Sequence, residues 1–298
     1  MKKSKVMLFG AMALTAGLAL AACGSSQSSN ADKTYSYIFV NNPDTLDYIT
    51  STRDSTSSIT TNLVDGLLEN DKYGNLNPSM AESRKESKDG LTYTYKIRKG
   101  DKWYTYEGEE YADVTAHDFV TGLKYAADKK AENLFLVQDS IKGLADYVEG
   151  QSSDFEAVGI KAVDDYTLQY TLNKPESYWN SKTTGGILSP VNEAFLKSKG
   201  DEFGSVTPSS ILSNGPYLFK SFTSKSLIEF EKNPNYWDKD NVKIEKVKLS
   251  FYDGSDQDSL ARGFLEGNYS DGRIIPTSSV VDQLKKGNEI KITYTPQN

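Results

Sequence analysis

The feature that most restricts how this chain can fold is its single cysteine, Cys23, which directly follows an apolar stretch near the N-terminus. Residues 6–22 carry no charge, consist mostly of Ala, Leu, Gly and Met, and come after a start that contains three lysines. This arrangement predicts a lipoprotein signal peptide over residues 1–22, and the apolar segment is short for a membrane-spanning helix. We expect Cys23 to carry a diacylglyceryl group on its thiol and an acyl group, such as palmitate, on its amine. The alternative is a plain secretory signal followed by a chance cysteine.

The mature chain that this signal predicts is acidic and free of internal disulfides. Without the three lysines of the signal, 31 Lys and Arg remain against 41 Asp and Glu, a net charge of −10. Such a chain is a poor partner for nucleic acid or for anionic lipid surfaces. We therefore expect no nucleic-acid partner, and contact with the extracytoplasmic face of the cell membrane through the lipid anchor only. Residues 23–33 are mostly polar and predict a flexible tether.

Apolar residues that alternate with polar ones predict several strands after the tether. The alternation over 91–97 indicates a half-buried strand, and the segments 158–163 and 166–172 on either side of two aspartates indicate a hairpin. Strands are also expected at 35–42, 247–251 and 290–294. Because helical segments lie between these strands, the pattern favours an α/β architecture.

Three helices are expected, and the first has a clear start. Thr115 is a good N-cap residue with Asp118 three positions on, which is the spacing of a capping box, and an apolar stripe follows. The second helix is expected at 58–68, with its apolar residues on one face, and the third at 279–286.

The residues offer little support for catalysis. His117 is the only histidine, and a triad would need a carboxylate and a serine brought to it by the fold. We interpret it as an exposed residue in the first turn of a helix. One histidine cannot build a His/Cys zinc site, and the acidic run that begins at Asp253 lacks the glycine and glutamate of a calcium loop. We therefore expect no enzyme, no cofactor and no metal.

Four sequence blocks, in order, resemble a known family. They are LNPSMAES at 76–83 with DGLTYTYKIRKG and KW at 89–103, VTAHDFV at 114–120, SNGPY at 213–217 and FEKNPNYW at 230–237. In the order of these blocks the chain resembles the oligopeptide and dipeptide solute-binding proteins of ABC importers. Among them it is similar in character to the streptococcal oligopeptide-binding lipoproteins. The resemblance covers about residues 35–298.

The resemblance implies a periplasmic-binding-protein-like fold of two lobes that close on a peptide. It places the first lobe at 34–266, with an extra domain inserted over about 55–170, and the start of the second lobe at 267–298. The partners that it implies are an oligopeptide ligand and the permease subunits of an importer, for a monomeric binding protein. Because family members are much longer, the chain looks truncated in its second lobe, and we expect it to bind peptide weakly or not at all.

The resemblance also suggests which residues line the cleft. A peptide bound as an added strand is held mainly through its backbone, so the cleft needs exposed main chain more than special side chains. For Tyr178 and Trp179, ordinary core packing is an equal alternative. The residues implied are Thr50, Thr52, Arg53, Asp54, Tyr178, Trp179, Asn214, Gly215 and Tyr217.

Two other functions stay open at this point. One is a lipid-anchored hydrolase. The lack of a suitable set of catalytic residues is evidence against it. The other is a truncated paralogue that does not transport and has a regulatory or vestigial role.

Overall fold

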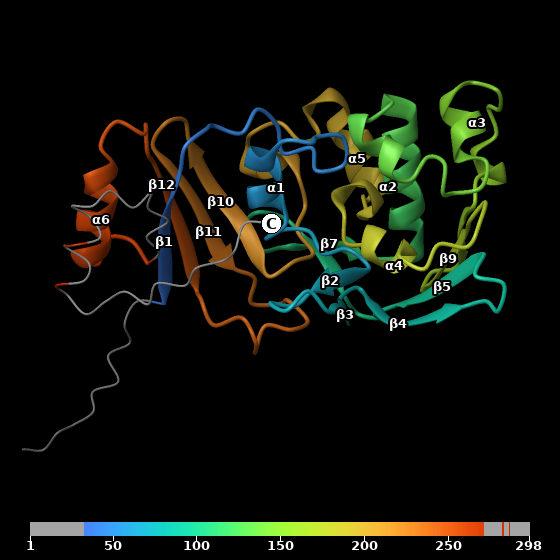
Figure 1. Ribbon diagram of the computed structural model, residues 1–298, viewed down its shortest axis with the longest axis horizontal. Helices are drawn as coiled ribbons and strands as arrows, with labels where there is room; N and C mark the ends of the chain where they lie inside the picture. Colours follow the sequence, from blue (N-terminus) through green and yellow to red (C-terminus); the bar gives the residue numbers. More distant parts are fainter. Residues whose placement is uncertain (1–32, 271–281, 283–285, 287–298) are drawn as a thin grey trace, which may run out of the picture. The chain divides into compact units, whose positions relative to one another are not determined.

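A four-stranded sheet, here called the scaffold sheet, joins residues that lie far apart in the sequence (Figure 1). The computed structural model describes residues 33–270, 282 and 286. The strand of this sheet that comes first in the sequence pairs in parallel with the strand that comes last in the sequence. The other neighbouring strands pair antiparallel. The chain between the first strand of this sheet and its second strand in sequence, residues 40–216, is therefore an excursion that starts from and returns to one sheet. In sheet order the strands are β1 (Thr34–Phe39), β12 (Lys246–Phe251), β11 (Leu227–Lys232) and β10 (Tyr217–Thr223).

The excursion contains a second, fully antiparallel sheet of four strands. Its apolar residues pack against α2 (Ala116–Lys129), whose Phe119 and Leu123 are completely buried. In sheet order the strands are β4 (Ala81–Glu86), β5 (Thr92–Ile97), β9 (Thr167–Thr171) and β8 (Ile160–Asp164). Two small hairpins complete the strands: β2 (Leu68–Asn70) with β3 (Leu76–Pro78), and β6 (Lys102–Tyr104) with β7 (Glu110–Asp113).

The remaining helices are short, and none in the described part of the chain is long and apolar enough to cross a membrane. The α-helices are α1 (Asp54–Thr60), α3 (Leu144–Val148), α4 (Trp179–Lys182), α5 (Glu193–Lys199) and α6 (Gln257–Leu265). The 3₁₀ helices are η1 (Glu132–Leu136), η2 (Phe155–Ala157), η3 (Gly186–Leu188), η4 (Gly200–Glu202) and η5 (Pro208–Ser210).

Most predicted elements are confirmed. The strands expected at 35–42, 91–97 and 247–251 are β1, β5 and β12, although β1 ends at Phe39. The predicted hairpin is β8 with β9. Both hydrogen bonds of the capping box at the start of α2 are present, from the Asp118 N–H to the Thr115 side chain and from the Thr115 N–H to the Asp118 side chain. The α/β prediction is confirmed. The strand at 290–294 lies outside the described residues, as does the helix at 279–286 apart from residues 282 and 286, which are helical.

The helix predicted at 58–68 is wrong in its second half, because α1 covers only Asp54–Thr60. The carbonyl of Leu63, which would extend the helix, instead accepts backbone N–H bonds from Asn214 (3.1 Å) and Gly215 (2.8 Å). A contact with a distant segment therefore replaces the local helical bonds that the apolar spacing favours.

A buried carboxyl group near the second sheet makes the stability of the fold depend on pH. The Asp101 Oδ2 atom lies 3.6 Å from Arg98 Nε, and the Arg98 guanidinium lies 3.8 Å from the centre of the Trp237 ring. Burial raises the pKa of Asp101 to about 7, because the nearby arginine offsets only part of the lost hydration. Between about pH 4 and about pH 7, the folded protein therefore keeps a proton that the unfolded chain has released.

We expect the free energy of unfolding to fall as the pH rises through this window, and Asp101→Asn to remove this contribution. The melting temperature of D101N relative to wild type should accordingly increase from pH 4 to pH 7 and level off above that range. Thermal melts followed by circular dichroism at several pH values measure this difference. A difference that is the same at pH 4 and pH 7 would contradict the prediction.

Candidate functional site

A cavity of about 1600 Å³ lies between the scaffold sheet and the segments around α1. Strand residues from the sheet form an aromatic and aliphatic part of its lining, and the loop after β1 adds polar groups. The short segment 129–132, from the last residue of α2 to the first residue of η1, also lines the cavity. The sheet residues are Tyr35, Tyr37, Ile38, Phe39, Tyr217, Ile228, Phe230, Val247 and Leu249.

One buried carboxylate, Asp47, fixes the loop that leads into α1. Its Oδ1 atom accepts the backbone N–H groups of Ile49 and Thr50, both at 3.1 Å. Its Oδ2 atom accepts the hydroxyl groups of Thr50 (2.7 Å) and Tyr125 (2.9 Å). Burial and the charge of Asp47 raise the pKa of Tyr125, so this phenol remains a hydrogen-bond donor. The cavity wall at Thr50 is therefore rigidly placed.

The next residues of the same loop carry paired polar groups at the rim. Arg53 Nε lies 3.1 Å from Asp44 Oδ2, and the Thr52 hydroxyl donates to Glu132 Oε2 at 3.1 Å. The second contact joins the loop to the segment after α2, 80 residues on. Of the residues that the resemblance implied, Thr50, Thr52, Arg53 and Asp54 therefore do lie together along this cavity.

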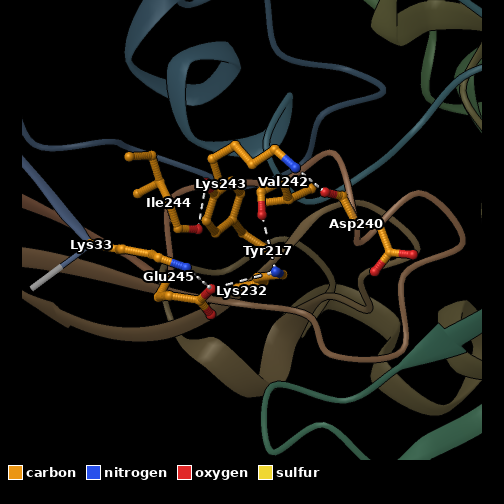
Figure 2. Close-up of polar contacts among 8 residues, drawn as sticks. All are labelled: Lys33, Tyr217, Lys232, Asp240, Val242, Lys243, Ile244 and Glu245. Carbon is orange, nitrogen blue, oxygen red and sulfur yellow. Dashed lines mark hydrogen bonds and ion pairs between the residues drawn. The ribbon is translucent and has the colours of Figure 1, made fainter. Parts of the chain in front are cut away.

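Tyr217 also lines the cavity, at the start of β10. Its hydroxyl donates to the Ile244 carbonyl at 3.1 Å (Figure 2), and burial raises the pKa of Tyr217. The segment that carries Ile244 is itself held in place, because Lys232 Nζ donates to the Val242 carbonyl at 3.0 Å and lies 3.5 Å from Glu245 Oε1 (Figure 2). The tyrosine is thus a fixed part of the wall.

Asn214 and Gly215 do not line this cavity, so it gives no support to their predicted place in a peptide cleft, which stays a prediction. Both are buried where β10 meets the end of α1. The Asn214 side chain accepts the Asp65 N–H at 2.8 Å and donates to the Asp65 carbonyl at 3.3 Å. A Cβ on Gly215 would lie 2.8 Å from the backbone carbonyl group of Leu63. The polar groups of these two residues form hydrogen bonds inside the fold. Both residues therefore support the cavity wall without lining the cavity.

Tyr178 and Trp179 are not cavity walls either. Trp179 is fully buried, and its ring centre lies 5.1 Å from that of Tyr170 and 6.1 Å from that of Tyr93. For Trp179 the alternative of core packing is therefore correct. Tyr178 is 56% exposed, and the Lys182 ammonium lies 5.1 Å from its ring centre.

The sequence reasoning missed most of the aromatic lining and the lysines at the rim. Tyr35, Tyr37 and Phe39 stand two apart, so their side chains share one face of β1. This alternation is a signal that could have indicated the floor of a cavity. For Lys129 and Lys130 we see no comparable signal, because charged residues at a helix end are common.

The described residues show no catalytic arrangement at the cavity. His117 is exposed, with Nε2 at 3.4 Å from Asp165 Oδ1, which confirms its expected place at the start of α2. Ser140 accepts from Lys182 Nζ at 2.7 Å and donates to Glu176 Oε1 at 2.8 Å, but it is buried and lines neither this cavity nor the smaller one behind α1. In the same described part of the chain, no group of three His, Cys, Asp or Glu residues could hold a metal ion.

The sequence matches one protein family over residues 75–298, described as bacterial extracellular solute-binding proteins, family 5 Middle. It is 59% identical over 300 residues to the oligopeptide-binding protein AliA of Streptococcus pneumoniae, across 100% of this chain and 46% of that protein. It is 58% identical over 306 residues to the oligopeptide-binding protein SarA of Streptococcus gordonii, again across 100% of this chain and 46% of the relative. The chain therefore spans about half the length of these relatives.

Solved structures agree with this match. The fold aligns with a TM-score of 0.75 to Listeria monocytogenes OppA bound to peptide, at 29% identity, across 86% of this chain and 48% of that one. It aligns with a TM-score of 0.76 to the substrate-binding domain of an oligopeptide ABC transporter from Bacillus anthracis, at 28% identity, across 86% and 47% of the two chains.

Proposed function

The chain belongs to the bacterial extracellular solute-binding proteins of family 5, and on that premise we propose that it captures oligopeptides for an ABC importer. The permease subunits of that importer are the proposed partners, and the protein acts as a monomer. The chain spans 46% of its relatives' length. Peptide capture is therefore a proposal for the protein that contains the described cavity.

The observation that carries the proposal is the size and lining of the cavity. Its volume of about 1600 Å³ exceeds the roughly 300–1,000 Å³ of pockets for small molecules. A ligand of several residues therefore suits it better than a single metabolite. Aromatic side chains offer flat apolar surfaces to varied peptide side chains, while the loop after β1 brings main chain and hydroxyl groups to the rim. Such a lining suits a peptide that is held largely through its backbone.

We also propose that Cys23 carries the lipid anchor and that the protein works at the extracytoplasmic face of the cell membrane. The support is the charge-free apolar segment before this cysteine and the polar run after it. Cys23 and the signal lie outside the described residues.

Mass spectrometry of molecules that co-purify with the protein, followed by calorimetric titration with an oligopeptide library, tests peptide capture. We expect peptides of several residues in the bound fraction and saturable binding of the same peptides. The weak or absent binding that the sequence predicts for the 298-residue chain is measured in the same titration, and sub-micromolar binding would contradict it. Tight binding of a non-peptide metabolite would overturn the proposed function.

Replacing His117 should leave function intact, because this exposed residue lines neither cavity. We expect His117→Ala to bind the same peptides as wild type and to change the free energy of unfolding by less than about 1 kcal/mol, the usual value of an exposed ion pair. Peptide titration and chemical denaturation measure the two quantities. A hydrolytic activity that H117A abolishes would instead support the alternative of an enzyme.

A further inference from the structure

Helix α2 ends in a turn that places a lysine where glycine is usually found. The Lys130 N–H donates to the Ala127 carbonyl (3.1 Å) and the Ala131 N–H donates to the Ala126 carbonyl (3.0 Å), the two bonds of a Schellman C-cap. This cap gives Lys130 a left-handed backbone, with φ and ψ both 51°. Because a Cβ is disfavoured in this conformation, glycine would be the more stable residue here.

Helix electrostatics alone does not account for the choice of lysine. A positive charge near a helix C-terminus is favourable, but Lys129 in the last turn of α2 already provides one. Within residues 33–270, the ammonium group of Lys130 forms no ion pair or hydrogen bond that would offset the free-energy cost of the left-handed backbone. The side chain is exposed and lines the cavity.

The other cations of the cavity lining have neighbours of their own. Arg53 is paired with Asp44 at 3.1 Å, and the Lys129 ammonium lies 5.9 Å from the centre of the Tyr125 ring. Lys130 is therefore the cation of the described lining that has no partner among the residues that the structure describes. A lysine on a flexible stem can adjust to a ligand group whose position varies.

We propose that Lys130 binds a carboxylate of the peptide ligand and so sets a preference for acidic ligands. The carboxylate is either the C-terminal group of the peptide or the side chain of an aspartate or glutamate. This inference rests on the proposed function, because it names the ligand group that one part of that cavity recognises. The backbone strain at Lys130 is then the cost of placing a positive charge at this point of the rim.

Three peptides of equal length separate the two sources of the carboxylate. One is an apolar peptide with a free C-terminus, the second is its C-terminal amide, and the third is the amide with one internal glutamate. Each is titrated by calorimetry against the full 298-residue wild-type chain and against Lys130→Gly. The matched control is Lys225→Gly, because Lys225 also has a left-handed backbone (φ 50°), is exposed and does not line the cavity.

We expect K130G to weaken the binding of the carboxylate-bearing peptides about fivefold, as for an exposed ion pair, and to leave the neutral amide unchanged. The free acid and the glutamate peptide show which carboxylate is used. Both glycine variants should raise the melting temperature by about 2 °C, because they relieve backbone strain. K225G should bind all three peptides as wild type does.

Two results would overturn the inference. If wild type binds the peptides and K130G keeps the same ratio between acid and neutral amide, the inference fails while the proposed function stands. If wild type binds none of the three peptides, the inference fails for this chain, and the proposed function is decided separately by the molecules that co-purify with the protein.

Discussion

Replacing Gly204 by alanine should destabilise the protein by roughly 3–5 kcal/mol, since the change adds backbone strain to a direct clash. Gly204 has a φ of +73°, and a Cβ there would lie 2.5 Å from the backbone nitrogen of Asp47. Its carbonyl accepts the Leu46 N–H at 2.6 Å and the Thr45 hydroxyl at 2.9 Å. The clash therefore involves the loop in which the Asp47 carboxylate holds Thr50 at the cavity. Chemical denaturation measures the loss.

The matched control for this prediction is Gly150→Ala. Gly150 has a similar φ of +79°, but a Cβ there would have no atom within 4 Å. This variant should show only the backbone strain, a loss of about 1 kcal/mol. Equal losses in the two variants would mean that the close approach to Asp47 contributes nothing. A melting temperature of G204A equal to that of wild type would contradict the packing of the loop against Gly204.

Replacing Cys23 by alanine should move the protein from the membrane fraction to the soluble fraction or leave its signal uncleaved. Each buried methylene of an acyl chain contributes about 0.8 kcal/mol of membrane binding, and stable attachment takes more than one chain. Without the thiol, none of these chains can be attached through a diacylglyceryl group. Phase separation in detergent measures the partition, and mass spectrometry of the mature N-terminus measures the modification.

Ser25→Ala provides the control, because it changes the polar run after the cysteine without touching the thiol. This variant should partition into detergent as wild type does. A wild-type protein that keeps Met1, or a mature protein with a free Cys23 thiol, would contradict lipid anchoring. A C23A variant that stays in the membrane fraction after cleavage would contradict it as well.

The sequence by itself determined the elements whose signals are local. The alternation over 91–97 is β5, and the Thr115–Asp118 spacing is a capping box in the folded protein. The ordered blocks at 76–120 and 213–237 identified the family. These predictions hold because a strand's period of two and a capped helix start depend on residues a few positions apart. The predicted lobe and domain boundaries remain predictions.

The tertiary structure alone decided which residues form the cavity. Whether Trp179 lines a cleft or fills the core depends on Tyr93, which comes from the distant strand β5, and on Tyr170 of β9, the strand that pairs with β5. The early end of α1 depends on N–H groups about 150 residues away that bind the Leu63 carbonyl. Lys130 reaches the rim only because the end of α2 meets the loop after β1. Contacts between distant segments leave no pattern in a single sequence, so only the fold places these side chains on a common surface.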